Sequence, residues 1–294
     1  MPTLFDAAAH CLTASTIDAK LVLTQQTAQA WHNGTLSLVA TDAVSPISAP
    51  GRPARPILVA PEAVPRRSLR TKVGWIALIH AITHIEFNAI NLAWDAVYRF
   101  RNLPESYYSD WIRVATEEAY HFHLLRQRLQ DLGSDYGNLP AHDGLWEMAI
   151  RTAADPLLRM ALVPRALEAR GLDVTPGIIR KLQQAGDHQT AAILEIILHD
   201  EIGHVAIGSR WFHHLCTQRG LDAELTFRNL VRRYITGQIS GPLHRAARQQ
   251  AGFSPAELDE LERLGTQKSA VPPATSPCPV QDESLQSYTR RSKR

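Results

Sequence analysis

Hydrophobic residues recur every three or four positions along four long stretches of the chain, which is the spacing of one face of an α-helix. The pattern predicts helices at about Ser68 or Thr71 to Arg101, Glu105 or Ser109 to Leu132, Asp143 to Arg170, and Asp187 to Cys216. Helices of this length, joined by short connections, pack side by side. The sequence therefore predicts an all-α protein whose centre is a four-helix bundle over residues 68–218.

Glycine and proline residues mark the expected ends and irregular points of these helices. Leu103-Pro104 is expected to end the first helix, and Gly133 stands where a glycine commonly follows the second. Pro164 removes a backbone hydrogen bond one turn before Glu168, which predicts a kink in the third region. Gly171 is expected to end that region.

Two further positions bear on the second half of the bundle. Thr175-Pro176 is expected to begin a separate short helix that reaches Ala185, because proline is favoured in the first helical turn. Gly208 lies in the middle of the fourth helix, where glycine costs about 1 kcal/mol relative to alanine. We expect Gly208 either to admit a bulky neighbour or to leave room for a ligand.

The chain outside the bundle divides by composition. We expect a helical lobe at residues 1–41, a proline-rich extended strap at 42–67, further helices at 219–265 and a disordered tail at 266–294. Ser15 or Thr16 is expected to cap the second helix of the lobe, which stops at Asn33-Gly34. Ser254 and Glu257 have the spacing of a capping box that opens a last short helix. The strap is interpreted as structural, with a ligand-binding loop as the alternative.

Acidic and imidazole side chains interrupt the apolar faces of the predicted bundle helices. A buried glutamate is costly unless it is paired or binds a metal. The residues concerned are Glu86, Glu118, His121, Glu168, Glu201 and His204.

These six residues form a repeated pattern. Glu118 and His121 make a Glu-x-x-His sequence, and Glu201 and His204 make a second one. Residues three apart on a helix share a face, so each pair can reach one metal ion. Glu86 lies 32 residues before Glu118, and Glu168 lies 33 residues before Glu201, which indicates two similar helical hairpins. A network of ordinary salt bridges is the alternative.

One glutamate and one Glu-x-x-His from each of two hairpins is the ligand set of a dinuclear carboxylate bundle. Oxygen and imidazole ligands suit iron or manganese better than metals that prefer thiolates. Bridging carboxylates can hold two such ions about 3.5–4 Å apart. The pattern therefore predicts two iron ions, two manganese ions or one of each.

Other polar residues near these motifs have less specific signals. Glu117 and Asp200 each precede a motif glutamate and lie four residues before a histidine, so they are candidates to hydrogen-bond the histidines, with a solvated helix charge as the alternative. His84 and His199 lie two residues before a ligand glutamate and are expected on outer helix faces. Tyr120 is expected to be a packing residue, with a redox role as the alternative.

Composition narrows the class of protein. The 294 residues are 45% hydrophobic and 20% charged, which is typical of a soluble globular protein. A net charge of only +2 gives no electrostatic signal for nucleic acid. Three scattered cysteines and the lack of a signal-peptide pattern favour the cytoplasm. We also expect no membrane span, because no uncharged apolar run reaches 18 residues.

The repeated Glu-x-x-His motif resembles that of the ferritin-like superfamily. More narrowly, the chain is similar to the family of ferritin-like proteins known as the domain of unknown function 455. That likeness is carried by His80-Ala-Ile-Thr-His-Ile-Glu86, Tyr136 to Trp146, Leu167 to Gly177 and His199 to Gly208. The resemblance implies the bundle and the six ligands, and it implies no reaction.

Two functions remain open from the sequence. The acidic residue before each motif glutamate resembles the Asp-Glu-x-x-His pattern of di-iron oxygenases, although Glu117 departs from the aspartate. We therefore expect an oxidase or hydroxylase that uses dioxygen or a peroxide, a small-molecule substrate and an electron donor. Because tRNA-modifying hydroxylases have a similar fold, a modified nucleoside is one substrate class. The alternative is a ferroxidase, an iron-handling protein or a peroxide-detoxifying protein; a scaffold with a structural metal is a third hypothesis.

Overall fold

The computed structural model describes residues 2–39, 43–65, 71–235 and 241–266. Regular structure within these residues is helical, and the only β-type pairing among them consists of two isolated bridges. The all-α prediction is confirmed.

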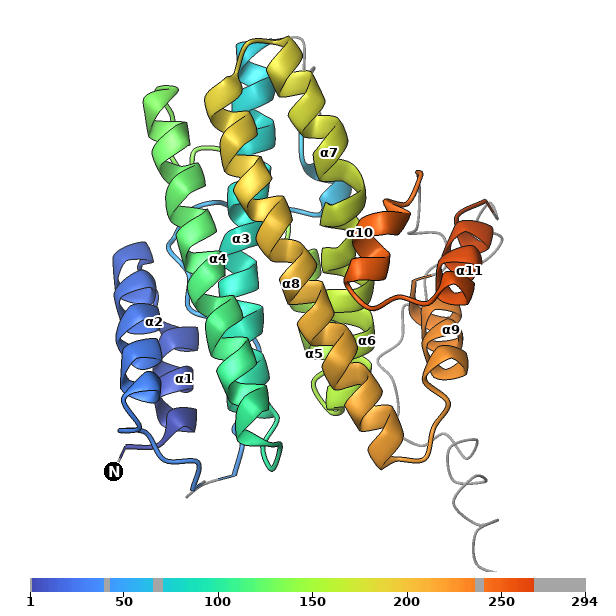
Figure 1. Cartoon of the computed structure of the whole chain (residues 1–294). Coiled ribbons are helices and arrows are strands. Elements are labelled where there is room, and N and C mark those ends of the chain that lie inside the picture. Colours follow the sequence, from blue (N-terminus) through green and yellow to red (C-terminus); the bar gives the residue numbers. More distant parts are fainter. Residues whose placement is uncertain (1, 40–42, 66–70, 236–240, 267–294) are drawn as a thin grey trace, which may run out of the picture.

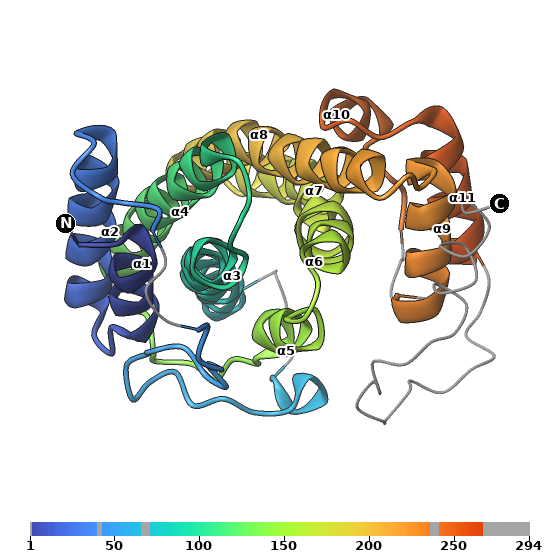
Figure 2. The same cartoon turned by 90° about the horizontal axis from the view of Figure 1, so that it is seen from below.

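Four long helical arms form the body of the molecule (Figure 1). Three arms are single helices: α3 (Lys72–Arg99), α4 (Glu105–Asp131) and α8 (His188–Gln218). The remaining arm is built from α6 (Pro156–Leu162), a π-helical turn (Val163–Glu168) and α7 (Ala169–Gln184). Seen along the bundle in Figure 2, α4 and α8 form one side, while α3 and the α6–α7 arm lie within their curve. The short helix α5 (Gly144–Arg151) lies next to α3 and the third arm, on the side away from α4 and α8.

The capping signals of the sequence set the ends of the bundle helices. The side chain of Thr71 accepts a hydrogen bond from Gly74 N at the start of α3, and that of Asp187 accepts one from Thr190 N at the start of α8. Gly133 follows α4 with a φ of +80°, a conformation that glycine adopts at little cost. These helix starts and ends lie close to the predicted ones.

Two sequence predictions for the third arm are wrong. Gly171 does not end a helix, and Thr175-Pro176 does not begin one, because both lie inside α7. The expected costs are about 1 kcal/mol for glycine and about 3 kcal/mol for proline within a helix. Leu172, Ile179 and Leu182 are buried on this helix, and each buried side chain of this kind contributes about 1.5–3 kcal/mol. Burial of one continuous face therefore outweighs both helix-breaking residues.

Where a kink is expected at Pro164, the structure has the π-helical turn Val163–Glu168. Gly208 of α8 faces this turn: a Cβ atom added there would lie 2.4 Å from Pro164 Cγ. Of the two roles expected for Gly208, the structure confirms the admission of a bulky neighbour.

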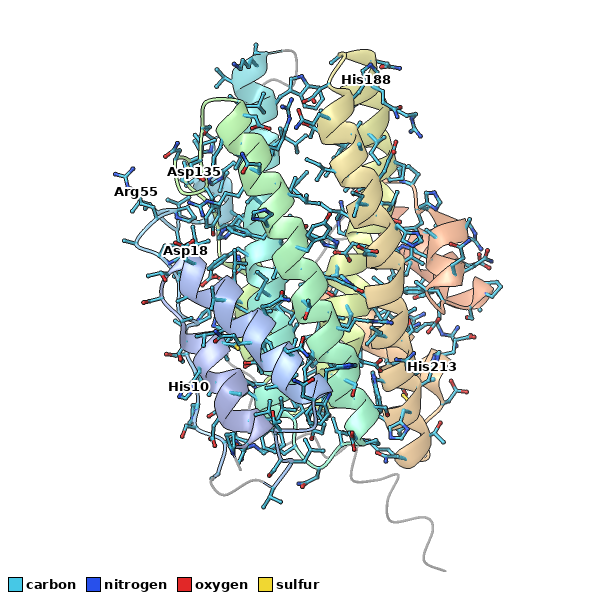
Figure 3. The ribbon with its side chains drawn as sticks, turned by 60° about the vertical axis from the view of Figure 1, so that its left-hand side comes forward. His10, Asp18, Arg55, Asp135, His188 and His213 are labelled. Atoms are coloured by element: carbon cyan, nitrogen blue, oxygen red, sulfur yellow. The ribbon has the colours of Figure 1, made fainter. Side chains whose placement is uncertain are left out.

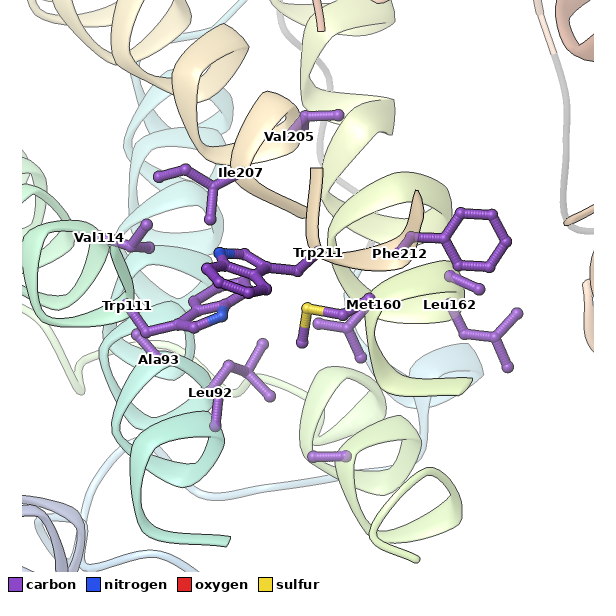
Figure 4. Packing of buried hydrophobic residues seen from close by; sticks show 14 of the residues in the cluster. Leu92, Ala93, Trp111, Val114, Met160, Leu162, Val205, Ile207, Trp211 and Phe212 are labelled. Atoms are coloured by element: carbon purple, nitrogen blue, oxygen red, sulfur yellow. The ribbon is translucent and has the colours of Figure 1, made fainter. Parts of the chain in front are cut away.

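The core of the lower bundle draws side chains from all four arms (Figure 4). Trp111 of α4 and Trp211 of α8 lie near Leu92 of α3 and Met160 of α6 in this view, and all four are buried members of one cluster. Aromatic side chains bury a large apolar area. This cluster therefore fixes how the arms are registered against one another.

The N-terminal helices α1 (Leu4–Thr13) and α2 (Ile17–His32) pack beside α3 and α4. Thr16 caps α2, as expected. Buried Lys20 donates hydrogen bonds to Asn91 Oδ1 (2.6 Å) and to the carbonyl oxygens of Cys11 and Leu12 (2.9 and 3.1 Å). Lys20 thereby joins α1 and α2 to α3.

Ion pairs connect helix α4 to helix α2 and to the loop that follows α4. Arg126 of α4 lies 3.8 Å from Asp18 of α2 and 3.0 Å from Asp135 in the loop after α4; both aspartates are labelled in Figure 3.

Residues 43–65 run as an extended segment with one short 3-10 helix, Pro61–Ala63. Arg52 pairs with Asp143, and Ser48 O accepts a hydrogen bond from Trp146 Nε1. The described part of this proline-rich segment is thus held against the start of α5.

Three helices follow the bundle: α9 (Ala223–Tyr234), α10 (Arg245–Gln250) and α11 (Pro255–Thr266). The predicted capping box is confirmed, because Glu257 N donates to Ser254 Oγ and Ser254 N donates to Glu257 Oε2. Helix α10 is not foreseen from the sequence, since its six residues are too few for a clear hydrophobic period. The predicted disordered tail lies, from residue 267 onward, outside the described residues.

Helix α3 is long and apolar enough to cross a membrane by length and composition alone. More than half of its most hydrophobic window is buried inside the protein, and core helices of soluble proteins pass the same test.

Candidate metal centre

The sequence-predicted residues come to the middle of the bundle from every arm. Glu86 comes from α3, and Glu118 and His121 come from α4. Glu201 and His204 come from α8, while Glu168 is the last residue of the π-helical turn. In each Glu-x-x-His pair the three-residue step puts both side chains on the inner face of one helix.

Four of these residues form a compact group. One ligand atom from each of Glu86, Glu118, His121 and Glu201 lies within 4.8 Å of the others. The side chains of Glu86, Glu118 and His121 are at most 3% exposed, and that of Glu201 is 13% exposed. Carboxylates are rarely buried to this degree without a partner of opposite charge.

Glu118 stands between the two histidines. Its Oε2 atom lies 3.4 Å from His121 Nδ1, and its Oε1 atom lies 3.0 Å from His204 Nδ1. Glu86 Oε2 lies 3.2 Å from His121 Nδ1, and Glu201 Oε1 lies 3.8 Å from His204 Nδ1. The cluster therefore has two halves, each with its own histidine and glutamate, that share Glu118.

Glu168 belongs to the same electrostatic environment. Burial, with the negative charges of Glu201 and Glu118, raises the pKa of Glu168 to about 8. Glu168 is not one of the four residues whose ligand atoms lie closest together. It adjoins the half of the cluster that contains Glu201.

Glu117 and Asp200 hydrogen-bond the histidines, but across the helix pair rather than along one helix. His121 Nε2 lies 3.0 Å from Asp200 Oδ2, and His204 Nε2 lies 2.7 Å from Glu117 Oε2. The spacing of four residues suggests a partner on the same helix. The inward rotation of each histidine directs its far nitrogen toward the neighbouring helix instead. These crossed bonds tie α4 to α8 at the cluster.

Burial raises the pKa of most carboxyl groups in the cluster. Burial and the charge of Glu118 raise the pKa of Glu86 and of Glu201 above the ordinary value. Burial alone would lower the pKa of His121, but hydrogen bonds to Glu118 and Glu86 raise it to about 11. Glu118 is the exception. Burial would raise its pKa, but His204 and His121 hold the pKa below the ordinary value.

Glu201 Oε2 is buried without a hydrogen bond in the described part of the chain. A buried polar atom left unpaired is costly, so such an atom at a site of carboxylates and imidazoles suits a bound cation. The group of Glu86, Glu118, His121 and Glu201 could hold metal ions.

Two of three neighbouring residues differ from the sequence predictions. His84 is not on a solvent-exposed face: it is buried, and its Nδ1 and Nε2 atoms lie 2.9 and 3.0 Å from Tyr136 Oη and His142 O. The loop after α4 covers this side of α3, which the helix period cannot reveal. His199 is exposed as expected. Tyr120 is 51% exposed, so the expected packing role is wrong.

His80 has a structural role that the sequence does not signal. Its Nε2 atom accepts a hydrogen bond from Gly137 N, and its ring stacks on Tyr136. With His84, it fixes the loop behind Glu86.

A cavity of about 290 Å³ lies on the seam between α4 and α8. Leu124, Ile193 and Ile196 give it an apolar lining, and His123 and Gln127 add polar groups. Leu124 is three residues after His121, so the nearest part of the cavity lining lies about one helical turn from the cluster along α4.

Comparison with known proteins identifies the family to which the chain belongs. Residues 13–259 match the family described as Protein of unknown function (DUF455). An uncharacterized protein from Haemophilus influenzae is 52% identical over 214 residues, which cover 70% of this chain and 74% of the relative. No solved structure matches the chain.

Proposed function

The chain belongs to the DUF455 family of proteins of unknown function, and since that description names no reaction, we propose from the site that it binds two iron or manganese ions and uses dioxygen to oxidise or hydroxylate a small substrate. The observation that supports this best is the buried convergence of both Glu-x-x-His motifs with Glu86. Four ionised glutamates would balance the charge of two divalent cations.

We assign one metal position to each half of the cluster. Glu86 and His121 would hold one ion, Glu168, Glu201 and His204 would hold the other, and Glu118, which lies between the two histidines, would help to hold both. Two such ions, when bound, supply the electron transfer and oxygen chemistry that protein side chains lack.

The crossed hydrogen bonds prepare the histidines for this role. A carboxylate can only accept a hydrogen bond, so Asp200 and Glu117 keep the proton of each imidazole on Nε2. Each Nδ1 lone pair is then directed into the cluster once its own proton is displaced. Such partners orient ligating histidines and raise their basicity.

The proposed partners follow from this chemistry. Dioxygen or a peroxide would be the oxidant, an electron donor would reduce the ions, and the seam cavity would suit a small and partly apolar substrate. Nucleic acid enters only as a modified-nucleoside substrate. Cys11 and Cys216 are buried free thiols, which supports a reducing compartment such as the cytoplasm.

One observation favours a second candidate, a ferroxidase or peroxide-detoxifying protein. Pro164 fills the space beside Gly208, and Glu86, Glu118, His121 and His204 are buried. Small inorganic species reach such a site more readily than an organic substrate does.

Dioxygen uptake by the ferrous-loaded protein distinguishes these functions. An oxidase or hydroxylase should sustain uptake only with reductant and an organic substrate from a screened set, whereas a ferroxidase should consume dioxygen in proportion to added ferrous ion. The Glu118→Gln/Glu201→Gln variant is the control and should consume none above background. Wild-type protein that behaves like this control with both iron and manganese would contradict both functions.

A further inference from the structure

The π-helical turn Val163–Glu168 carries Glu168 at its last residue, so the placement of this turn sets the placement of the carboxylate. One side of the turn is pressed against α8 through the contact of Pro164 with Gly208. Gly208 follows His204 by four residues, or about one turn. The turn is therefore registered directly against the second Glu-x-x-His motif.

The next residue, Arg165, is held by the C-terminal helices. Its side chain is fully buried, and its Nη2 atom donates a 2.8 Å hydrogen bond to Glu257 Oε2, whose side chain is 2% exposed. Arg165 Nε donates to Ser209 Oγ of α8 at 3.1 Å. The guanidinium also lies 4.1–4.8 Å from the ring centres of Phe212, Phe227 and Phe253.

This arrangement fixes Arg165 from three directions. Ser209 and Phe212 belong to α8, Phe227 belongs to α9, and Glu257 is anchored at the start of α11 by its hydrogen bond from Ser254 N. A planar guanidinium with fixed partners has few alternative positions. A buried ion pair adds little stability compared with an apolar pair of similar size. The main effect of the Arg165–Glu257 pair is therefore the fixed position that it gives to Arg165.

A second buried bridge joins the same C-terminal helices to the third arm. Arg248 of α10 donates two hydrogen bonds to Asp173 of α7, at 2.9 and 2.7 Å, and both side chains are at most 4% exposed. This bridge attaches the helices to α7 but does not touch the π-helical turn. Attachment of the C-terminal helices therefore does not depend on Arg165 alone.

We propose that Arg165 and Glu257 are positioning residues that hold the π-helical turn so that Glu168 completes the second of the two metal positions. The assignment rests on the proposed function, because it requires metal binding at the cluster. It gives the helices after the bundle a specific role in the site: through Glu257 they set the affinity for one ion of the pair.

The test compares two double variants in the full-length chain. Arg165→Met/Glu257→Gln removes the bridge to the turn without leaving an unpaired charge, and the amide oxygen introduced by Glu257→Gln can still accept the hydrogen bond from Ser254 N. Arg248→Met/Asp173→Asn removes the matched bridge to α7. Each protein is made metal-free and titrated with cobaltous ion, with binding followed by calorimetry and by the visible absorption of the bound ion.

The Arg165→Met/Glu257→Gln variant should bind the first ion within about twofold of wild type and the second at least tenfold more weakly, as expected when groups that support ligands are removed. Its absorption spectrum with the second ion should also change. The Arg248→Met/Asp173→Asn variant should retain both affinities within about twofold, even where its melting temperature falls.

Equal second-ion affinity in wild type and the Arg165→Met/Glu257→Gln variant would overturn the assignment and leave the proposed function intact. Equal losses in both double variants would also overturn it, because docking of the C-terminal helices would then be the cause. Wild-type protein that binds no ion would overturn the proposed function itself.

If Arg165→Met/Glu257→Gln does not fold, Arg165→Lys alone is tested with the same criteria. Lysine keeps the positive charge beside Glu257, but it lacks the planar fork that bonds Ser209 and Glu257 together.

Discussion

At the scale of single residues, the site is defined by which atom each side chain turns inward. The spacing of Glu118, His121, Glu201 and His204 puts them on inner helix faces, and this much follows from the helix period alone. The crossed partners do not follow from spacing, because Asp200 and Glu117 reach the histidine of the other helix. Pairing across helices depends on the distance and rotation of α4 and α8, which a local pattern does not contain.

Replacing Asp200 by asparagine should weaken metal binding by about 10–100-fold, because His121 would lose the charged partner that orients its Nε2–H. Titration of the metal-free protein with manganous ion measures this change. Glu195→Gln is the matched control, since Glu195 is an exposed acid on the same helix. Equal affinities for Asp200→Asn and wild type would show that the crossed bond does not support the site.

Metal binding should release protons, and the affinity should therefore rise with pH. At pH 7 the pKa values of Glu168, about 8, and His121, about 11, leave both groups protonated in the metal-free protein. An incoming ion must displace these protons, so the logarithm of the association constant should rise by about one per pH unit for each proton released. Titrations between pH 6 and 7.5 measure the slope. An affinity independent of pH would contradict the prediction that a bound ion displaces protons from Glu168 and His121.

At the scale of elements, the sequence predicts the long helices well and the third arm poorly. Capping residues and the hydrophobic period locate α3, α4 and α8. The third arm contains Pro164, Gly171 and Pro176, and local rules predict breaks at the latter two that burial of α7 overrides. The burial of His84 has the same origin: a loop distant in sequence covers its helix face.

Gly208→Ala should destabilise the protein by about 1–3 kcal/mol, because the new methyl group would meet the Pro164 ring at 2.4 Å. Gly203→Ala on the same helix is the control. Nothing lies within 4 Å of a Cβ atom there, so this change should be neutral or stabilising by up to about 1 kcal/mol. Chemical denaturation of both metal-free variants measures the difference. A Gly208→Ala variant as stable as Gly203→Ala would show that the π-helical turn adapts freely.

At the scale of the whole molecule, helices outside the bundle pack on it from two sides. Helices α1 and α2 are joined to α3 through Lys20, while α9 to α11 reach the π-helical turn through Glu257. Composition identifies these flanking regions as helical, but their contacts depend on buried charged residues. Lys20, Arg165 and Arg248 look like surface residues in the sequence, since such side chains are rarely buried.

Removing residues 267–294 should leave the melting temperature within about 2 °C of the full chain, because their composition offers little apolar surface for packing. Thermal unfolding of the truncated and full-length proteins, both metal-free, tests this. A larger fall would mean that this segment docks on the body.

The central claim is that the buried cluster binds two metal ions per chain, and metal content tests it most directly. Metal-free protein is loaded anaerobically with ferrous or manganous ion, freed of excess ion and analysed for metal and protein. Wild type should contain about two ions per chain, and the Glu118→Gln/Glu201→Gln variant, which loses the shared carboxylate and one ligand of the second half, should contain close to none. A wild-type content near zero with both metals would contradict the account.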